Sequence, residues 1–384
     1  MQKMLIVTTV PDTLLYILRD QPKFLSEFFE LSLATNSDPR IEELCHHENV
    51  MVYPIPIIRN ISPVADVVSI IRMIQLIVKL KPTLIHSYTP KAGLVSMISA
   101  FLTRVPIRVH TFTGLVFPTA QEPTRTLLKW VDRLICFCAT DIVPEGLGVK
   151  SDLERFSITH RSSDPIGHGN IAGIDIDYFS VDATGMTAAA QSLLESLDLP
   201  ENTFIFSFIG RLNKDKGVSE LVNAFSNLPI EAHLVIAGDL DLSAPLDSAT
   251  SELIESHARI HALGFVDDVR PLLAISDILV LSSYREGFPN VLLQAGAMRR
   301  PAIASDINGC NEIIENGKNG WLVPAKDVDG LQQAMQTAMN EEAQTLHNMG
   351  KNAREKVVGQ FERQAHWSRM LAFYRALIQK KQHK

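Results

Sequence analysis

Short apolar segments alternate with helical segments in both halves of the chain, and this alternation restricts the possible folds more than any other feature of the sequence. In the first half, Met4–Val10, Thr83–Thr89 and Ile107–Thr113 have the length and composition of buried strands. Pro90, directly after the second strand, suits the first position of a helix. A further helix is predicted from about 123 to 135. Alternation of this kind predicts a parallel, doubly wound sheet.

The second half starts the same alternation again after a turn-rich segment, Asp164–Asn170. Its predicted strands are Phe204–Gly210, His233–Gly238, Ile260–Gly264, Ile278–Ser282, Pro301–Ser305 and Trp321–Pro324. A chain of 384 residues is long for one core, so we expect two domains, residues 1–175 and 176–362. Apolar side chains at spacings of three and four predict that 363–384 is a C-terminal helix with one apolar face. We expect this helix to pack back toward the first domain. The expected fold class is α/β, with two Rossmann-like doubly wound domains facing a central cleft.

Composition and charge exclude several classes of protein. The formal net charge of −7 argues against nucleic-acid binding. No run approaches the roughly 20 apolar residues of a membrane-spanning helix. Met4–Val10 is too short for a signal peptide and lacks a cleavage site, and the four cysteines form no C-x-x-C pair. We therefore expect a cytoplasmic protein with reduced thiols. Most of the net negative charge falls after residue 180, so the first half is the one expected to approach an anionic surface.

A loop with two cations follows the first strand of the second half. Arg211 and Lys216 lie five residues apart in Gly210–Gly217, between a predicted strand and a predicted helix. Ligands of open α/β sheets bind at the carboxyl ends of the strands, where this loop begins. The planar donor group of Arg211 and the mobile charge of Lys216 together suit a diphosphate. Two solvated loop cations are the alternative interpretation.

The segment Tyr284–Met298 joins an acidic loop to an apolar helix. Gly287 allows the backbone to approach a ligand closely, and Pro289 suits the first turn of a helix. The N–H groups near 288–291 then point out of a helix N-terminus, which favours a phosphate or sugar oxygen. Glu286 has the wrong charge to contact a phosphate and is better suited to accept hydrogen bonds from sugar hydroxyls.

With these motifs, the chain resembles the retaining glycosyltransferases of family 4, which have the GT-B fold. The resemblance rests on Arg-x4-Lys followed by EGFPNVLLQAGAM, and the segments VPEGLGVKSDL, GNIAGIDIDYF and LGFVDDV fall where the family has comparable segments. HSYTPKAG, VHTFTGLVF and QAGAM are similar to the branch that builds bacterial capsule, O-antigen and lipid-linked oligosaccharides. The resemblance covers essentially the whole chain.

The resemblance implies a role for each of these positions. Glu286 would contact the hydroxyls of the donor sugar, while Arg211 and Lys216 would neutralise the departing nucleoside diphosphate. His110 matches a histidine of the first domain that lies near the reacting sugar. The other implied donor-binding residues are Gly210, the turn residues Gly287, Phe288, Pro289, Asn290 and Val291, residue 294 at the ribose, and Gly264, Phe265 and Val266 at the base.

The sequence departs from the family pattern at two places. Residue 294 is Gln294, where the family usually has Glu. Gln294 stands among apolar residues, so we expect it to be buried with hydrogen-bond partners. An amide can accept from one ribose hydroxyl and donate to the other, so we expect ribose binding to survive. The first loop, Thr8–Pro11, lacks the glycines that many family members have there.

The expected acceptor is a lipid-linked saccharide in the assembly of bacterial surface polysaccharide or glycan. The candidate acceptor-binding residues are His86, Lys91, Thr113 and Gly114. Two apolar and basic stretches, Lys23–Phe29 and Arg125–Arg133, are candidates for peripheral contact with the cytosolic face of the inner membrane. Packing of two ordinary helices on the sheet explains these stretches equally well.

The sequence thus predicts an enzyme of the glycosyltransferase type. It would move a hexose or an N-acetylated hexosamine from a nucleoside diphosphate sugar, taken to be UDP-linked, with retention of configuration. We expect no cofactor and no required metal, since the family generally works without one and His46 and His47 have no partner at metal-ligand spacing. Two alternatives are a sugar-nucleotide epimerase of the same architecture and a non-catalytic sugar-nucleotide-binding protein. A nicotinamide dehydrogenase is disfavoured because neither half opens with G-x-G-x-x-G.

Overall fold

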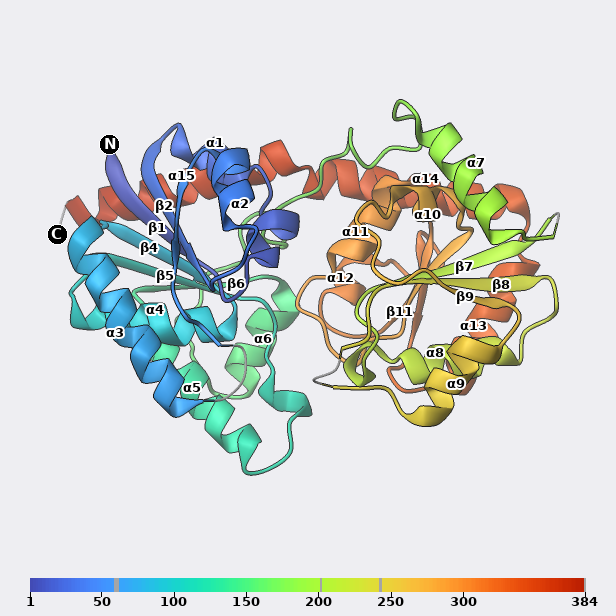
Figure 1. Ribbon diagram of the computed structural model, residues 1–384, viewed down its shortest axis with the longest axis horizontal. Helices are drawn as coiled ribbons and strands as arrows, with labels where there is room; N and C mark the ends of the chain where they lie inside the picture. The colour runs from blue at the N-terminus through green and yellow to red at the C-terminus, as the bar shows by residue number, and fades with distance from the viewer. Residues whose placement is uncertain (59–61, 201, 242–243, 383–384) are drawn as a thin grey trace. The chain divides into compact units, whose positions relative to one another are not determined.

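A computed structural model describes residues 1–58, 62–200, 202–241 and 244–382 and divides the chain into two compact units (Figure 1). Unit 1 comprises Met1–Gly173 and Arg363–Lys384, and unit 2 comprises Ile174–Glu362. Each unit contains a six-stranded, entirely parallel sheet with helices on both faces. The predicted fold class, two doubly wound Rossmann-like domains, is confirmed. Among the described residues, no helix is both long enough and apolar enough to span a membrane.

The sheet of unit 1 has the strand order β3-β2-β1-β4-β5-β6. Its strands are β1 (Gln2–Val7), β2 (Phe29–Thr35), β3 (Met51–Pro54), β4 (Leu84–Tyr88), β5 (Ile107–Phe112) and β6 (Asp141–Pro144). The three strands that the sequence predicts are present, although β1 ends three residues earlier than expected. The strand order reverses between β1 and β4, so the loops after these two strands are neighbours at the carboxyl edge.

Successive residues of β1 face opposite sides of the sheet, and each side has its own core. Leu5 and Val7 belong to the core beneath α3 (Pro63–Leu80), α4 (Pro90–Leu102), α5 (Thr124–Cys138) and α6 (Leu147–Arg155). Met4 and Ile6 belong to the core beneath α1 (Gln21–Ser26), α2 (Ile41–Glu48) and α15 (Arg363–Gln382). Two single turns, η1 (Thr13–Ile17) and η2 (Phe117–Thr119), complete the unit.

The C-terminal helix α15 packs into unit 1, as the sequence predicted. The Trp367 indole N–H donates to the Ala172 carbonyl at 3.0 Å, and the Tyr374 hydroxyl is hydrogen-bonded to His86 Nδ1 at 2.5 Å. Trp367, Met370 and Tyr374 are buried. The 20 residues of α15 therefore contribute to the core of the first domain, although 189 residues of unit 2 precede them in the chain.

The sheet of unit 2 has the order β12-β11-β10-β7-β8-β9. Its strands are β7 (Phe204–Ile209), β8 (Ala232–Ala237), β9 (Ile260–Ala262), β10 (Ile278–Leu281), β11 (Ala302–Ser305) and β12 (Gly320–Val323). All six strands that the sequence predicts are present. The order reverses between β7 and β10, so this junction is the topological switch point. The Arg211–Gly217 loop and the loop that begins at Ser282 leave the sheet side by side at this point.

The helices of unit 2 cover both faces of its sheet. One face carries α8 (Val218–Ser226), α9 (Ser248–Ser256) and α13 (Val328–Asn340). The other carries α7 (Met186–Leu197), α10 (Arg270–Ile275), α11 (Asn290–Ala297), α12 (Cys310–Ile313) and α14 (Ala343–Phe361). A single turn, η3 (Lys214–Lys216), lies in the loop between β7 and α8. The helix α11 is the one that the Tyr284–Met298 segment predicts.

Candidate active site

The two loops at the switch point of unit 2 are joined by direct hydrogen bonds. The Ser282 hydroxyl, at the end of β10, contacts the carbonyls of Lys216 and Gly217 at 3.1 and 2.8 Å. The Tyr284 N–H donates to the Asp215 carbonyl at 2.8 Å, and the Arg285 guanidinium pairs with the Asp215 carboxylate at 2.8 Å. The two motifs that the sequence singled out, 70 residues apart, therefore form one rigid element.

Gly217 is required where these loops touch. Its φ of +63° lies in the left-handed region, and a Cβ at this position would lie 2.0 Å from the Ser282 carbonyl oxygen. Any side chain would push the loops apart at the point that sets the position of Lys216.

Lys216 and Glu286 meet at the centre of this joint. Lys216 Nζ is 2.5 Å from Glu286 Oε1, and the Ser283 hydroxyl donates to the same oxygen at 2.6 Å. The Asn213 side chain accepts the Lys216 N–H at 3.0 Å and so fixes the turn η3. Both charged side chains are partly buried, so they are held in place rather than free in solvent. The alternative interpretation of Lys216 as a solvated loop cation does not fit this geometry.

Arg211 belongs to a second ion pair beside the first. Its Nη1 lies 2.6 Å from Asp241 Oδ2, and the Asn213 amide donates to the same oxygen at 3.1 Å. Backbone hydrogen bonds between Leu212 and the loop after β8 bring Asp241 to this position. Arg211 remains about half exposed, which leaves its remaining donors accessible to a ligand. Each of the two predicted diphosphate-binding cations is thus paired with a carboxylate.

The turn from Gly287 to Val291 is fixed by packing against the rest of unit 2. The Phe288 side chain is buried, and its ring packs against that of Phe361 with the centroids 5.4 Å apart. The Gly287 carbonyl lies so close to Gly309 that a Cβ there would be 2.3 Å away. Pro289 stands immediately before α11, and the half-buried Asn290 and Val291 form its first turn. Phe288 therefore contributes its backbone to the site, while its ring anchors the turn.

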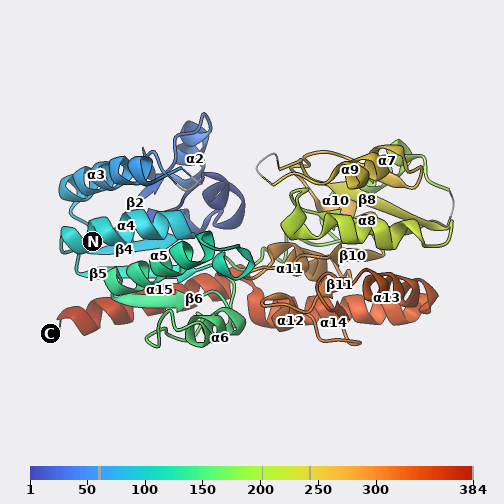
Figure 2. The ribbon, with the colours of Figure 1, turned by 90° about the horizontal axis from the view of Figure 1, so that it is seen from below.

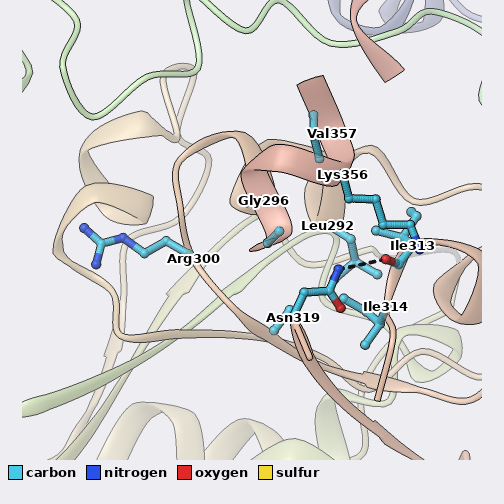
Figure 3. Close-up of a pocket in the computed structure, with 10 residues that line it drawn as sticks. Leu292, Gly296, Arg300, Ile313, Ile314, Asn319, Lys356 and Val357 are labelled. Atoms are coloured by element: carbon cyan, nitrogen blue, oxygen red, sulfur yellow. Dashed lines mark hydrogen bonds between the residues drawn. The ribbon is translucent and has the colours of Figure 1, made fainter. Parts of the chain in front are cut away.

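The helix α11 has one face packed on the protein and one open. Gly296 faces α14, where a Cβ would lie 2.9 Å from the Val357 side chain. Figure 3 shows the small cavity at this contact, with Leu292 and Gly296 from α11, Lys356 and Val357 from α14, and Asn319 donating to the Ile313 carbonyl. This cavity lies behind the helix and holds none of the predicted site residues.

Gln294 is half-buried rather than buried, and its side chain has no hydrogen-bond partner among the described residues. The expectation that it would be buried with protein partners is wrong. The tightly packed side of α11 is formed by the small and apolar residues around it, which leaves the amide on the accessible side. An amide without a protein partner is available to a ligand.

The loop predicted to meet a nucleotide base is open. The Gly264 carbonyl accepts the Gly238 N–H at 2.7 Å, and Gly264 has a φ of +68°. Phe265 is 60% exposed, and Val266 is half-buried. On the neighbouring strand, the Gly210 N–H donates to the Ala237 carbonyl at 2.9 Å. These loops lie at the same carboxyl edge as Arg211 and Lys216.

In unit 1, His110 is buried within β5. Its Nδ1 is 2.8 Å from the Ser87 hydroxyl, and its Nε2 has no hydrogen-bond partner among the described residues. Burial lowers the pKa of His110 to about 3, so the imidazole is neutral at ordinary pH. Gly93 of α4 packs against the ring, and a Cβ there would lie 2.3 Å from Cε1. His110 can therefore offer one neutral ring nitrogen, but it does not act as a charged acid.

The other candidate acceptor residues differ in how accessible they are. His86 is buried, with Nδ1 on Tyr374 and Nε2 on Thr111 at 2.7 Å, so both of its nitrogens have protein partners. Burial, and then the neighbouring His110, hold the pKa of His86 well below its ordinary value. Lys91 is paired with Asp66 at 2.6 Å.

Thr113 and Gly114, directly after β5, are half-buried, and Gly114 has a φ of +90°. The hydroxyls of Thr9 and Thr89 lie 2.6 Å apart and connect the loop after β1 to the start of α4. The glycine-free first loop therefore still reaches the switch point of unit 1.

Several residues that shape the site were not found from the sequence. Ser282, Ser283, Asp215 and Asp241 hold the two loops and neutralise their cations. Cys310 is buried close by, and burial, followed by the charge of Glu286, raises the pKa of its thiol well above the ordinary value. Only Asn213 has a local signal, because an Asn three residues before Lys216 is a typical cap.

A carboxylate and histidine cluster in unit 1 was also missed. His47 Nε2 lies 2.9 Å from Asp20 and 3.8 Å from Glu48, so His47 does have partners at metal-ligand distance. The buried Glu48 carboxylate accepts the N–H groups of Asp20 and Lys23 at the start of α1, and Arg363 pairs with Asp20. These contacts give the side chains of the cluster protein partners, and the cluster connects α1, α2 and α15.

Comparisons with known proteins agree with this geometry. A family model described as "Glycosyl transferases group 1" matches residues 191–356, and a model described as "Glycosyl transferase 4-like domain" matches residues 25–155. The capsular polysaccharide biosynthesis glycosyltransferase CapM of Staphylococcus aureus is 27% identical over 96% of both chains. An Escherichia coli UDP-Gal:alpha-D-GlcNAc-diphosphoundecaprenol alpha-1,3-galactosyltransferase is 28% identical over 88% of this chain and 86% of its own.

Among solved structures, Anabaena HepE in complex with UDP and glucose has the same fold. It superposes with a TM-score of 0.80 at 17% identity, over 97% of this chain and 99% of that chain. The two family models fall on the two units described above. The chain therefore belongs to the glycosyltransferases of the family 4 kind, and it is a glycosyltransferase with the GT-B fold.

Proposed function

We propose that the enzyme transfers a hexose or an N-acetylated hexosamine from a UDP-sugar to a lipid-linked saccharide during assembly of a bacterial surface polysaccharide, with retention of configuration. The observation that carries this proposal is the Lys216–Glu286 pair at the switch point of unit 2, with Arg211 beside it. Lys216 can serve the diphosphate and Glu286 the sugar hydroxyls, and their side chains stand 2.5 Å apart.

The donor nucleotide is proposed from the relatives and from the open edge of the site. The Anabaena HepE structure is a complex with UDP and glucose, and the Escherichia coli relative is named for the donor UDP-Gal. In this chain, the diphosphate would lie against Arg211 and Lys216, the ribose against Gln294, and the base against Gly264–Val266. The accessible amide of Gln294 and the open loop after β9 support this order.

The two ion pairs give the proposed mechanism. A diphosphate would replace the carboxylates as the partner of Arg211 and Lys216, which would free Glu286 for the sugar. In a front-face substitution, the bond from the anomeric carbon to the phosphate oxygen breaks while the bond to the acceptor oxygen forms on the same face. The departing phosphate oxygen takes the acceptor proton. Arg211, Lys216 and the N-terminus of α11 stabilise the charge on the departing diphosphate, which is electrostatic catalysis.

We propose that the reaction needs no metal, because these cations would carry the charge that a metal neutralises in other phosphate sites. Within unit 1, His110 would offer its neutral Nε2 to the sugar. The acceptor would meet Thr113 and Gly114, and Lys91 after exchange of its Asp66 partner. His86 would not contact the acceptor and would only stabilise the core, since both of its nitrogens are hydrogen-bonded to protein side chains.

The acceptor class is proposed from the relatives. The Staphylococcus aureus protein is described as a capsular polysaccharide enzyme, and the Escherichia coli protein by a diphosphoundecaprenol-linked acceptor. A polyprenyl diphosphate carrier is embedded in a bilayer, so the enzyme would work peripherally at the cytosolic face of the membrane.

A thermal-shift screen of UDP- and GDP-sugars, followed by transfer to a polyprenyl diphosphate saccharide, tests this proposal. We expect UDP-sugars to raise the melting temperature and one of them to label the lipid-linked product with retained configuration. Binding without any transfer would instead support a non-catalytic protein, and a change of the donor sugar without an acceptor would support an epimerase.

A further inference from the structure

One face of unit 1 concentrates the exposed apolar side chains of the protein. Half of the large apolar side chains that are exposed in the described residues lie on α3, α4 and α5. They are Val64, Val67, Val68, Ile71 and Val78 on α3, Phe101 and Leu102 at the end of α4, and Leu127, Trp130, Leu134 and Phe137 on α5. We call these eleven residues the α3–α5 face. Such a concentration on a soluble domain marks a site of interaction.

The apolar residues form stripes on helices that lie next to one another. On α3 they recur at spacings of three, four and seven, and on α5 at spacings of three and four, so each set follows one side of its helix. Figure 2 shows α3, α4 and α5 side by side, with α4 between the other two. The Phe101 and Phe137 rings, 5.5 Å apart, connect the end of α4 to the end of α5. The stripes therefore share one surface.

The charges on these three helices are almost all positive. The basic residues are Arg72, Lys79, Lys91, Arg125, Lys129 and Arg133. The only acidic residues are Asp66, which is paired with Lys91 at 2.6 Å, and Asp132, which is 6% exposed. The whole chain has a net charge of −7, so the basic character is local to this side of the protein.

The aromatic side chains have the arrangement expected at a lipid headgroup layer. Trp130 is 62% exposed, with the Arg133 guanidinium 5.1 Å from its ring centroid. The Arg108 guanidinium lies 5.6 Å from the centroid of the Phe101 ring. Exposed aromatic rings flanked by basic groups suit an interface where one side is apolar and the other carries anionic phosphates.

We propose that the α3–α5 face docks on an anionic bilayer surface, with Trp130 and Phe137 inserted among the headgroups. This inference rests on the proposed function, because the bilayer would be the one that contains the lipid-linked acceptor. Anionic headgroups complement the five basic residues other than the paired Lys91, while the apolar stripes bury their exposed area. A second copy of the chain fits less well, since an isologous contact would place the same positive charges opposite each other.

The other apolar and basic stretch of the sequence, Lys23–Phe29, does not supply this surface. The Phe24 ring lies 5.4 Å from the Trp367 ring, and Arg375 lies 5.2 Å from the centroid of Phe28. Leu25 and Phe29 are buried in the core. This stretch uses its apolar side chains to hold α15.

Flotation of the full chain with lipid vesicles tests the docking face. We expect binding to phosphatidylcholine vesicles that contain phosphatidylglycerol, little binding to phosphatidylcholine alone, and loss of binding at high salt. The paired variant Trp130→Ala and Phe137→Ala should bind at least about tenfold more weakly. The paired variant Arg125→Gln and Lys129→Gln should lose about tenfold or more, and only in the anionic vesicles. The control Ile230→Ala changes a 78% exposed apolar residue of unit 2 and should bind like the wild type.

Quenching of Trp130 by brominated lipids gives a second readout that does not depend on the variants. Trp130 is the most exposed of the three tryptophans, since Trp321 is half-buried and Trp367 is buried. We expect quenching in the wild type that is lost in Trp130→Phe. No binding to anionic vesicles, or equal binding by wild type and the Trp130→Ala, Phe137→Ala variant, would overturn the docking proposal. A dimer in solution that this variant dissociates would also overturn it.

Transfer assays separate this inference from the proposed function. The Trp130→Ala, Phe137→Ala variant should keep wild-type turnover with a short-chain, water-soluble acceptor and lose it with the vesicle-embedded acceptor. Equal activity on both acceptors would contradict docking while leaving the transferase proposal intact. Vesicle binding without transfer to either acceptor would contradict the proposed function and leave the docking face standing.

Discussion

At the scale of single residues, the site is formed by charges that neutralise one another. Lys216 is held by Glu286, and Arg211 by Asp241. Neither cation is free, so a diphosphate must offer each one a better partner than a carboxylate. Two phosphate groups near two cations do so, because they bring more negative charge and more acceptor oxygens to the same space.

Gln294 gives a prediction for nucleotide binding. Its amide has no partner among the described residues, and it lies on the open side of α11. Gln294→Ala should weaken UDP binding roughly tenfold, the effect of one or two lost hydrogen bonds. Gln294→Glu should largely keep the affinity, because a carboxylate can accept from both ribose hydroxyls. Calorimetric titration with UDP checks both variants, and unchanged affinity in Gln294→Ala would make the residue purely structural.

Asp132 gives a prediction for stability against pH. Burial raises the pKa of this carboxyl to about 7 from 3.8. A raised pKa means that the folded state binds the proton more tightly than the unfolded state. The protonated Asp132 is therefore fully compatible with folding below about pH 4, and the fold loses stability as the pH rises to about 7 and the buried carboxyl ionises. Asp132→Asn should therefore gain stability relative to wild type across that window, by at most about 4 kcal/mol. Urea unfolding at pH 5 and pH 8 measures the difference in unfolding free energy between Asp132→Asn and wild type. The same difference at both pH values would contradict the prediction.

The sequence predicted the site residues that carry a local signal, and it missed those whose partners are remote. Arg211, Lys216 and Glu286 follow strands in recognisable loops, so their positions could be predicted. Asp241 reaches Arg211 only because the loops after β7 and β8 pair. His47 similarly meets Asp20, 27 residues away, through the packing of two helices. No spacing rule connects such residues in the sequence.

At the scale of elements, the position of the site depends on how closely two loops approach at the switch point. The strands of unit 2 were predictable because buried parallel strands are nearly continuous apolar runs. The contact between the loops after β7 and β10 was not, because it depends on strand order.

Gly217 tests how much this contact matters. Gly217 and Gly185 both precede helices with left-handed backbone, at φ of +63° and +80°. A Cβ at Gly217 would meet the Ser282 carbonyl at 2.0 Å, whereas a Cβ at Gly185 would meet nothing within 4 Å. Gly185→Ala should cost about 1–2 kcal/mol for the backbone conformation alone. Gly217→Ala should cost more than about 3 kcal/mol and also weaken UDP binding. Equal losses of stability in the two variants, measured by urea unfolding, would contradict this account.

At the scale of the whole molecule, the two units have similar sheets but carry different functional groups. Both are doubly wound, and the switch point of unit 2 carries the Lys216–Glu286 and Arg211–Asp241 pairs. Unit 1 has neutral, buried histidines within β4 and β5 and an apolar, basic face on its helices. The division into nucleotide-sugar binding by the second domain and acceptor binding by the first remains a proposal that these differences support.

Hydrogen exchange of the full chain tests this division. UDP should slow exchange in Arg211–Gly217 and Tyr284–Gln294, because a bound diphosphate orders the loops that hold it. Exchange in α3 and α5 should not change with UDP, but it should slow with anionic vesicles. Protection of the unit 1 helices by UDP alone, without change in the unit 2 loops, would contradict the assignment of the donor site.

The most direct test of the central claim is the turnover of sugar transfer by Arg211→Ala and Lys216→Ala, measured at saturating UDP-sugar with a lipid-linked acceptor. If these two cations stabilise the departing diphosphate, each variant should lose about a hundredfold to a thousandfold in kcat. The control Lys351→Ala removes an exposed lysine of α14 and should keep wild-type turnover. Unimpaired kcat in Arg211→Ala and Lys216→Ala would contradict the account.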